Sequence, residues 1–414
     1  MKKKNITQIV FSIILIASNL SVSAQTRTNA QNLIFTNEDS LNQGVSKQKT
    51  VISGYGSAFY QRNFSAGLST ATLERAVLFV GHQFNSKISL FTELEVENAL
   101  VEGTKEKGEV AMEQAFLKFN LNPAQYIVAG LFVPRIGILN ENHLPVNFNG
   151  VERPLVEELV IPATWREVGV GFYGRSNKLP LNYSVAILNG LNSEGFEHGN
   201  GIREGRAEGS NATANNLAIT AALQYNWKNF KFQVSGYTGG TVGLNKHDAD
   251  SLGLKGGVFG TPVYLVEGNV QFNSNAFSAK ALFANISFPD ADKINTAYEK
   301  NLANNMYGGY LEFAYDWLYK KQGKANFTTF ARYEIFDLNA ALPAPPKAIY
   351  DGTLKQHHLV AGISYLPIPN VVVKADIRLM HTGEQNPDLV TDTPGSLPFR
   401  QNISFLNIGI GYSF

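Results

Sequence analysis

Short segments in which apolar and polar residues alternate recur along most of the chain. In the segment 371–380, for example, Val373 and Ile377 fall on one face, while Lys374 and Asp376 fall on the other. A period of two residues is typical of β-strands that have one apolar and one polar face. The pattern predicts an all-β protein with strands close to the following ranges: 52–60, 72–84, 88–97, 110–119, 125–133, 166–175, 181–190, 215–227, 230–238, 262–272, 276–288, 306–319, 325–338, 355–366, 371–380 and 402–414.

The connections between these segments alternate between short and long. Tight turns, such as those at residues 122–123 and 228–229, alternate with long polar loops such as 191–214 and 239–261. This alternation is typical of outer-membrane barrels, which have short periplasmic turns and long extracellular loops. A soluble β-sandwich has no reason to separate its loops by length in this way. Residues 51–414 are therefore predicted to form a transmembrane antiparallel β-barrel of about 16 strands.

The first 24 residues have the three parts of a secretory signal peptide. Lys2, Lys3 and Lys4 precede a short apolar run, and the small residues Ser23 and Ala24 mark a cleavage site. The apolar run is shorter than the ~20 residues that a membrane-spanning helix needs. We interpret residues 25–50, which are rich in Asn, Gln, Ser and Thr, as a flexible periplasmic leader. The predicted location is the outer membrane of a Gram-negative-type bacterium.

The chain ends on an uncharged alternating strand, NIGIGYSF, in which Ile408, Ile410, Tyr412 and Phe414 share one face. A soluble sheet with one buried face gives the same period, so alternation alone does not separate the two cases. The signal peptide, the unequal loops and this aromatic terminus together favour a membrane barrel whose apolar faces contact outer-membrane lipid. Terminal aromatic strands of this type resemble the signal read by barrel-assembly machinery, which is a predicted partner.

Composition narrows the possible functions. The chain has no cysteine, so it has neither disulfides nor thiolate metal sites. Without the three signal lysines, 35 − 3 = 32 basic residues face 34 acidic ones, a net charge of −2, which does not suit a nucleic-acid partner. His357 and His358 are neighbours in a strand and point to opposite faces, so they are a poor metal pair. No spacing sets apart a nucleophile with its base, and we predict neither an enzyme, nor a metal, nor a cofactor.

The third long connection, residues 134–164, is unusually apolar for a surface loop. Apolar residues are more often packed inward than exposed to water, so we predict that this segment, called loop 3 below, folds into the lumen. Packing at a subunit contact is the alternative. The charges in and beside loop 3 are then candidates for the pore constriction: Arg135, Arg153, Glu157, Glu158 and Arg166.

The polar faces of the strands predict the residues that line the pore, because sixteen strands are enough to leave an aqueous channel. The predicted pore-lining charges are Glu93, Glu95, Lys231, Glu267, Lys280, Glu312, Arg332, Glu334, Lys374, Asp376 and Arg378.

Several fragments, in this order and spacing, resemble the phosphate-selective porins O and P: EQAFLKFNL, YIVAGLFVPRIG, VERP, YSVAILNG, YGGYLEFAYDWL and FARYEIFDLN. The resemblance runs from about Gly54 to Phe414. It implies a sixteen-stranded barrel, a third loop folded inward, a homotrimer and passive uptake of anions. The predicted inward charges depart from the family pattern, since they carry both signs and form no ladder of Arg and Lys.

The sequence thus predicts a porin, a water-filled channel for passive diffusion of small hydrophilic solutes, with anions such as phosphate as one class of solute. The alternative is an outer-membrane barrel that serves in binding or adhesion through its long extracellular loops.

Overall fold

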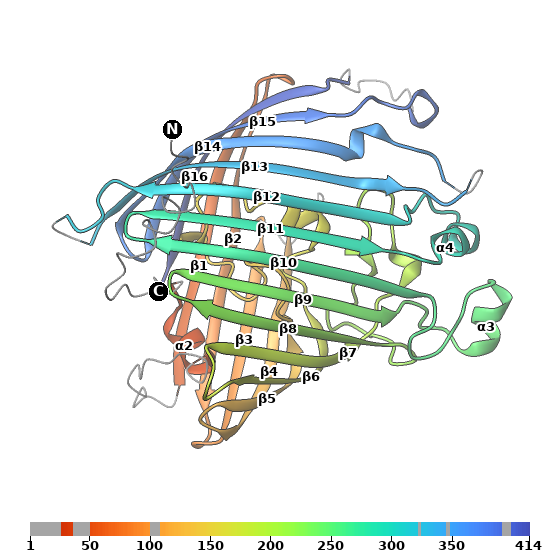
Figure 1. Cartoon of the computed structure of the whole chain (residues 1–414), viewed down its shortest axis with the longest axis horizontal. Coiled ribbons are helices and arrows are strands. Elements are labelled where there is room, and N and C mark those ends of the chain that lie inside the picture. Colours follow the sequence, from red (N-terminus) through yellow and green to blue (C-terminus); the bar gives the residue numbers. More distant parts are fainter. Residues whose placement is uncertain (1–25, 36–49, 100–107, 322–323, 345–347, 391–398) are drawn as a thin grey trace, which may run out of the picture.

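The structure, a computed structural model, describes residues 26–35, 50–99, 108–321, 324–344, 348–390 and 399–414. Within these residues, sixteen strands form a closed antiparallel barrel in which each strand pairs with its neighbours in sequence and β16 pairs with β1 (Figure 1). This confirms the predicted fold class. The strands are β1 (Thr50–Asn63), β2 (Leu68–Gln83), β3 (Ile88–Glu97), β4 (Glu109–Asn122), β5 (Gln125–Phe132), β6 (Glu167–Arg175), β7 (Leu181–Asn189), β8 (Leu217–Trp227), β9 (Phe230–Gly240), β10 (Pro262–Ser274), β11 (Phe277–Ser287), β12 (Asn305–Asp316), β13 (Asn326–Ala341), β14 (Lys355–Ile368), β15 (Val371–Thr382) and β16 (Asn402–Ser413).

The connections fall into two groups, as predicted, with one exception. The predicted link at 61–71 is only residues 64–67, because pairing between β1 and β2 continues to Asn63 and Leu68. The other connections on that side of the barrel are long, whereas the opposite side has short turns such as 228–229 and 369–370. The long connections carry two of the helices, α3 (Lys246–Ser251) and α4 (Ala291–Tyr298), at one end of the barrel (Figure 1).

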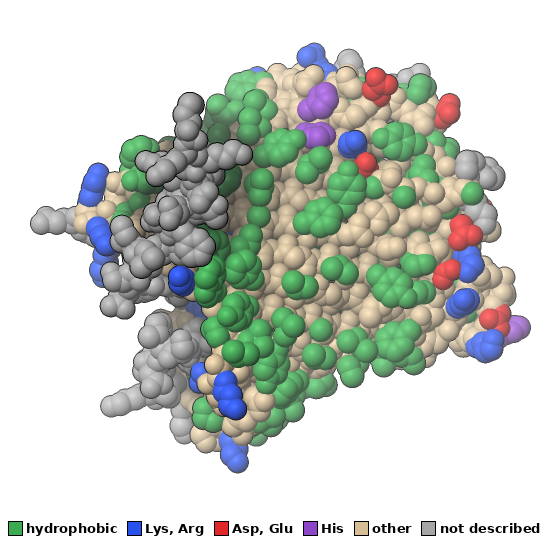
Figure 2. Space-filling view, viewed as in Figure 1, with side chains coloured by type: hydrophobic (Ala, Val, Ile, Leu, Met, Phe, Trp, Pro, Cys, Tyr) green, Lys and Arg blue, Asp and Glu red, His purple; other side chains and the backbone are tan. Residues whose placement is uncertain are grey.

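The outer face of the wall is apolar. Leu223, Val266 and Phe283 expose 55%, 61% and 55% of their surface there. The side chains of the final strand, Ile410 and Phe414, are similarly exposed, as the alternation predicted. Figure 2 shows hydrophobic side chains spread over the wall, with most charged side chains toward its two ends. Exposed apolar surface of this extent does not suit contact with water, whereas it suits hydrocarbon.

Aromatic rings gather at the short-turn end of the outer wall. Trp227 of β8 stacks on Phe230 of β9, and the Phe230 ring lies 4.7 Å from that of Phe272 in β10. The series continues across β11 and β12, where Phe277 stacks on Phe313 at 6.3 Å. Rows of aromatic side chains at this height are typical of the two interfaces of a membrane-spanning barrel.

The sheet closes between β1 and β16. Tyr55 pairs with Ser413, and the backbones of Gly54 and Phe414 exchange hydrogen bonds of 3.0 and 2.9 Å. The Phe414 ring packs over Gly54, where an added Cβ would lie 3.0 Å from the ring. Closure leaves the wall without an unpaired strand edge, which a sheet in hydrocarbon requires.

Part of the predicted flexible leader lies against the inner wall. Residues Asn29–Phe35 form helix α2, and the Ala30 amide donates to Ser53 Oγ at 3.2 Å. Ser53 and Gly81 are small residues that face inward and leave room for this helix; a Cβ at Gly81 would lie 3.1 Å from Leu33. The structure therefore differs from the prediction over these residues. The predicted signal peptide, 1–24, lies outside the described residues.

None of the helices in the described ranges combines the length and the apolar character that crossing a membrane would require.

Candidate functional site

Loop 3 lies inside the barrel, within the connection of residues 133–166 that joins β5 to β6. Most of its apolar side chains are buried, and those of Ile136, Leu144 and Val156 are fully buried. The loop also carries two short helical turns, η1 (Pro145–Asn147) and η2 (Val156–Val160). The apolar composition that predicted inward packing is thus explained by contacts with the inner wall.

Charged side chains of the wall hold the backbone of loop 3. The amide of Val151 donates to Asp376 at 2.7 Å, and the amide of Val156 donates to Glu334 at 3.2 Å. In return, Lys374 Nζ donates to the carbonyl oxygen of Gly150 at 2.8 Å. The wall therefore satisfies backbone groups of loop 3 that would otherwise be buried without partners.

The charges on β11, β12 and β13 also pair with one another. Glu312 lies opposite both Lys280 and Arg332 in the strand register. Arg332 Nη1 is 3.2 Å from Glu312, and its Nε is 2.7 Å from Glu334. Asn149 of loop 3 completes the group by donating to Glu312 at 2.9 Å. Paired buried charges of this kind fix a geometry and leave little net charge to act on a solute.

The residues predicted to line the pore lie on the inner face, but most of them contact protein rather than open water. The buried ones are Glu93, Glu95, Glu267, Glu312, Arg332, Glu334, Lys374 and Asp376. The partly exposed ones are Lys231, Lys280 and Arg378. Alternation alone gives no indication of how much of the inner face loop 3 covers, and the role of these side chains in lining a pore stays a prediction.

The predicted constriction charges separate into two groups. Glu157 is fully buried: Tyr310 OH and the amides of Ile138 and Leu139 each donate to its carboxylate at 2.7 Å. Burial raises the pKa of Glu157, and these hydrogen bonds lower it only part of the way back. Arg135 is also buried, 2.7 Å from Glu141. A constriction role does not fit either residue, because their charges are already enclosed by partners.

Arg166 is buried too, with Nη2 2.7 Å from Glu208 and Nη1 3.6 Å from Glu113. Arg153 is buried as well, with 8% of its surface exposed, whereas Glu158 is partly exposed. Near them, Glu152 lies 3.4 Å from Arg378 and accepts hydrogen bonds from Gln61 and Asn407. These contacts place the tip of loop 3 against β15, β16 and β1. The role of Arg153 and Glu158 in a constriction stays a prediction.

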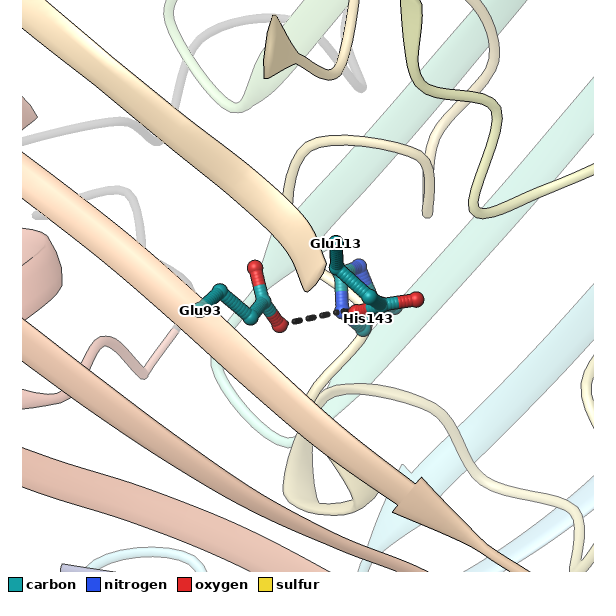
Figure 3. Close-up of side chains that lie close together, drawn as sticks. All are labelled: Glu93, Glu113 and His143. Atoms are coloured by element: carbon teal, nitrogen blue, oxygen red, sulfur yellow. Dashed lines mark hydrogen bonds and ion pairs between the residues drawn. The ribbon is translucent and has the colours of Figure 1, made fainter. Parts of the chain in front are cut away.

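A third group was not expected from the sequence. Glu93 of β3, Glu113 of β4 and His143 of loop 3 are buried together, and one ligand atom from each lies within 4.8 Å of the others (Figure 3). Simple alternation from Lys118 would place Glu113 on the outer face. A β-bulge opposite Glu93 and Leu94 shifts the register so that Glu113 turns inward.

We expect Glu157→Ala to loosen loop 3 and Glu158→Ala to leave it ordered. The first change leaves three buried donors without an acceptor, a cost of about 1–3 kcal/mol for each group left without a partner. Amide hydrogen exchange of residues 136–140 measures the effect. Equal exchange in the two variants would contradict the role assigned to Glu157.

The fold is shared with several outer-membrane proteins. The anion-selective porin from Comamonas acidovorans has a TM-score of 0.53 with 10% identity, over 88% of this chain and 99% of that one. The outer membrane channel DcaP of Acinetobacter baumannii has a TM-score of 0.52 with 12% identity, over 88% and 97% of the two chains. Pseudomonas putida OprB has a TM-score of 0.52 with 10% identity, over 88% and 94%. The class that the fold defines is therefore the sixteen-stranded, porin-like β-barrel.

No family model matches the chain. An uncharacterized protein of Aquifex aeolicus is 30% identical over 342 residues, which are 80% of this chain and 75% of that protein. The chain belongs to the same family as this Aquifex protein.

Proposed function

We propose that the protein is an outer-membrane porin through which small hydrophilic solutes diffuse passively. The observation that supports this most strongly is that the same strands carry an apolar face outside and a charged, polar face inside. Two neighbours in β12 illustrate this arrangement: Phe313 is 53% exposed on the outer wall, and Glu312 is buried inside the barrel. Such a wall separates hydrocarbon from a polar interior.

The structure also supports a restricted channel. Loop 3 crosses the interior from β5 and β6 to β15, β16 and β1, and helix α2 occupies space beside β1 and β2. The path left for solutes is narrowed by both segments, so we propose that only small solutes pass.

Selectivity for phosphate is not favoured by the inner charges. Some of the basic residues of the wall pair with acidic ones, as Arg332 does with Glu312 and Glu334, and Lys280 with Glu312. Charge selection requires a ring of one sign. We therefore propose a general channel for small polar solutes. Anions such as phosphate pass through it among other solutes, without being specifically selected. Export by the signal at residues 1–24, assembly through the strand ending at Phe414 and a homotrimeric state belong to the same proposal.

Reconstitution of the folded protein in planar lipid bilayers tests the proposal. We expect discrete conductance steps, and a reversal potential near zero in a gradient of potassium chloride because neither ion is strongly preferred. Phosphate should not block the chloride current. A change of gel mobility on heating shows that the barrel in the sample is folded. If such a sample gives no conductance, the channel proposal is wrong, and binding or adhesion through the long loops is favoured.

A further inference from the structure

We propose that Glu93, Glu113 and His143 form a binding site for a divalent first-row metal ion that joins loop 3 to strands β3 and β4. The three side chains are enclosed by protein and lie close together (Figure 3), with one ligand atom of each within 4.8 Å of the other two. One imidazole and two carboxylates suit Zn²⁺, Mn²⁺ or Fe²⁺.

The orientation of the His143 ring supports metal binding. Nδ1 lies 3.1 Å from the carbonyl oxygen of Asn140. A carbonyl oxygen only accepts hydrogen bonds, so Nδ1 carries a proton, and in the neutral ring Nε2 presents its lone pair to the two carboxylates. A backbone carbonyl or carboxylate on the second nitrogen is the usual way in which proteins orient a metal-binding histidine. Without a metal ion or a further proton between them, the lone pair would face two carboxylates.

The distances suit a metal better than a proton. His143 Nε2 lies 3.3 Å from Glu93 Oε1 and 3.6 Å from Glu113 Oε2. Charge-assisted N–H···O bonds are shorter, at about 2.7–2.9 Å. Two ligands each about 2.1 Å from a tetrahedral metal are separated by about 3.4 Å, close to both observed values.

Each ligand is also held by a second group, and one ligand atom has no hydrogen-bond partner. Gln114 donates to Glu93 Oε2 at 2.5 Å, and Thr164 donates to Glu113 Oε1. Glu113 Oε2, in contrast, is buried and accepts no hydrogen bond from the described residues. A buried carboxylate oxygen without a donor is costly, and a cation at this point would satisfy it.

Arg166 lies near the site but does not replace the metal. Its Nη1 is 3.6 Å from Glu113 Oε1, the carboxylate oxygen that Thr164 contacts, while its Nη2 is 2.7 Å from Glu208. The two carboxylates therefore retain negative charge that one divalent ion would balance.

Metal retention by the full-length, detergent-solubilised protein tests the site. After removal of metal with a chelator, the sample is incubated with Zn²⁺, washed and analysed by inductively coupled plasma mass spectrometry. We expect the wild type to retain about one more Zn²⁺ per chain than His143→Ala. Heat-modifiable gel mobility shows that each variant is folded. The variants Glu93→Gln and Glu113→Gln test the same site, because they remove a carboxylate while the shape of the side chain stays nearly unchanged.

His198→Ala is the matched control. His198 also has Nδ1 against a carbonyl oxygen, that of Asn301 at 2.9 Å, but its Nε2 meets a single carboxylate, Asp351, at 3.2 Å. This variant should retain as much metal as the wild type. As a second readout, Co²⁺ in place of Zn²⁺ should give the visible absorption of a low-coordinate site, and His143→Ala should abolish it.

Two outcomes would overturn the proposal. If the wild type retains no metal, a protonated His143 alone bridges the carboxylates; if all variants retain equal amounts, the metal is adventitious. Neither outcome affects the proposal of a channel, because the conductance of the wild type tests that proposal independently.

Discussion

Replacing residues 137–162 of loop 3 by a short Gly-Ser linker is expected to raise single-channel conductance severalfold. The loop crosses the interior and is hydrogen-bonded to β12, β13 and β15 through Glu312, Glu334, Lys374 and Asp376. Its removal would return these charges to water and widen the path, because a sixteen-stranded wall by itself encloses an aqueous channel. Conductance in planar bilayers measures the change.

The same linker in place of residues 245–253, around helix α3, is the control. Most of these residues are exposed at the long-loop end of the barrel. Their loss should leave the conductance steps close to those of the wild type. If removal of loop 3 has no more effect than removal of this segment, loop 3 does not limit the passage of ions.

A basic residue on the outer wall is expected to have the largest effect on stability. Val266→Arg places a guanidinium near the middle of β10, where the valine is 61% exposed on the apolar face. The expected loss in the free energy of unfolding is about 2–4 kcal/mol, the cost of a basic residue at the bilayer midplane. Denaturant titration in lipid vesicles, followed by tryptophan fluorescence, provides the measurement.

Val266→Leu, which keeps an apolar side chain in the same place, should be close to neutral. The same arginine substitution in a barrel kept in detergent should also cost less, because detergent and water relax around the charge. An arginine that destabilises no more than leucine in vesicles would show that this face does not contact hydrocarbon.

The wall could be predicted from the sequence to within a few residues at most strand ends, because strand pairing and burial impose the same two-residue period. Strand β3 shows this most directly: the predicted range 88–97 is the observed one, and Glu93 and Glu95 face inward as expected. The terminal strand likewise presents Ile408 and Ile410 outward.

The contents of the barrel could be predicted only in part. The apolar run of loop 3 indicated that it packs inward, but no local pattern gives its partners, since Gly150 and Lys374 are far apart in sequence. Glu113 was missed because a single-residue bulge reverses the face on which it lies. Helix α2 was missed because its segment is polar and its site depends on two small residues of the wall, Ser53 and Gly81.

The pairing of β1 with β16 has a consequence for the rate of folding. Tyr55 and Ser413 are opposite each other although nearly the whole chain separates them. Contacts of such high sequence separation form slowly. The chain loses conformational entropy when the distant segments come together, before the favourable energy of the contact is gained. We therefore expect an open sheet with two free edges to be the long-lived folding intermediate, and the one most prone to aggregate.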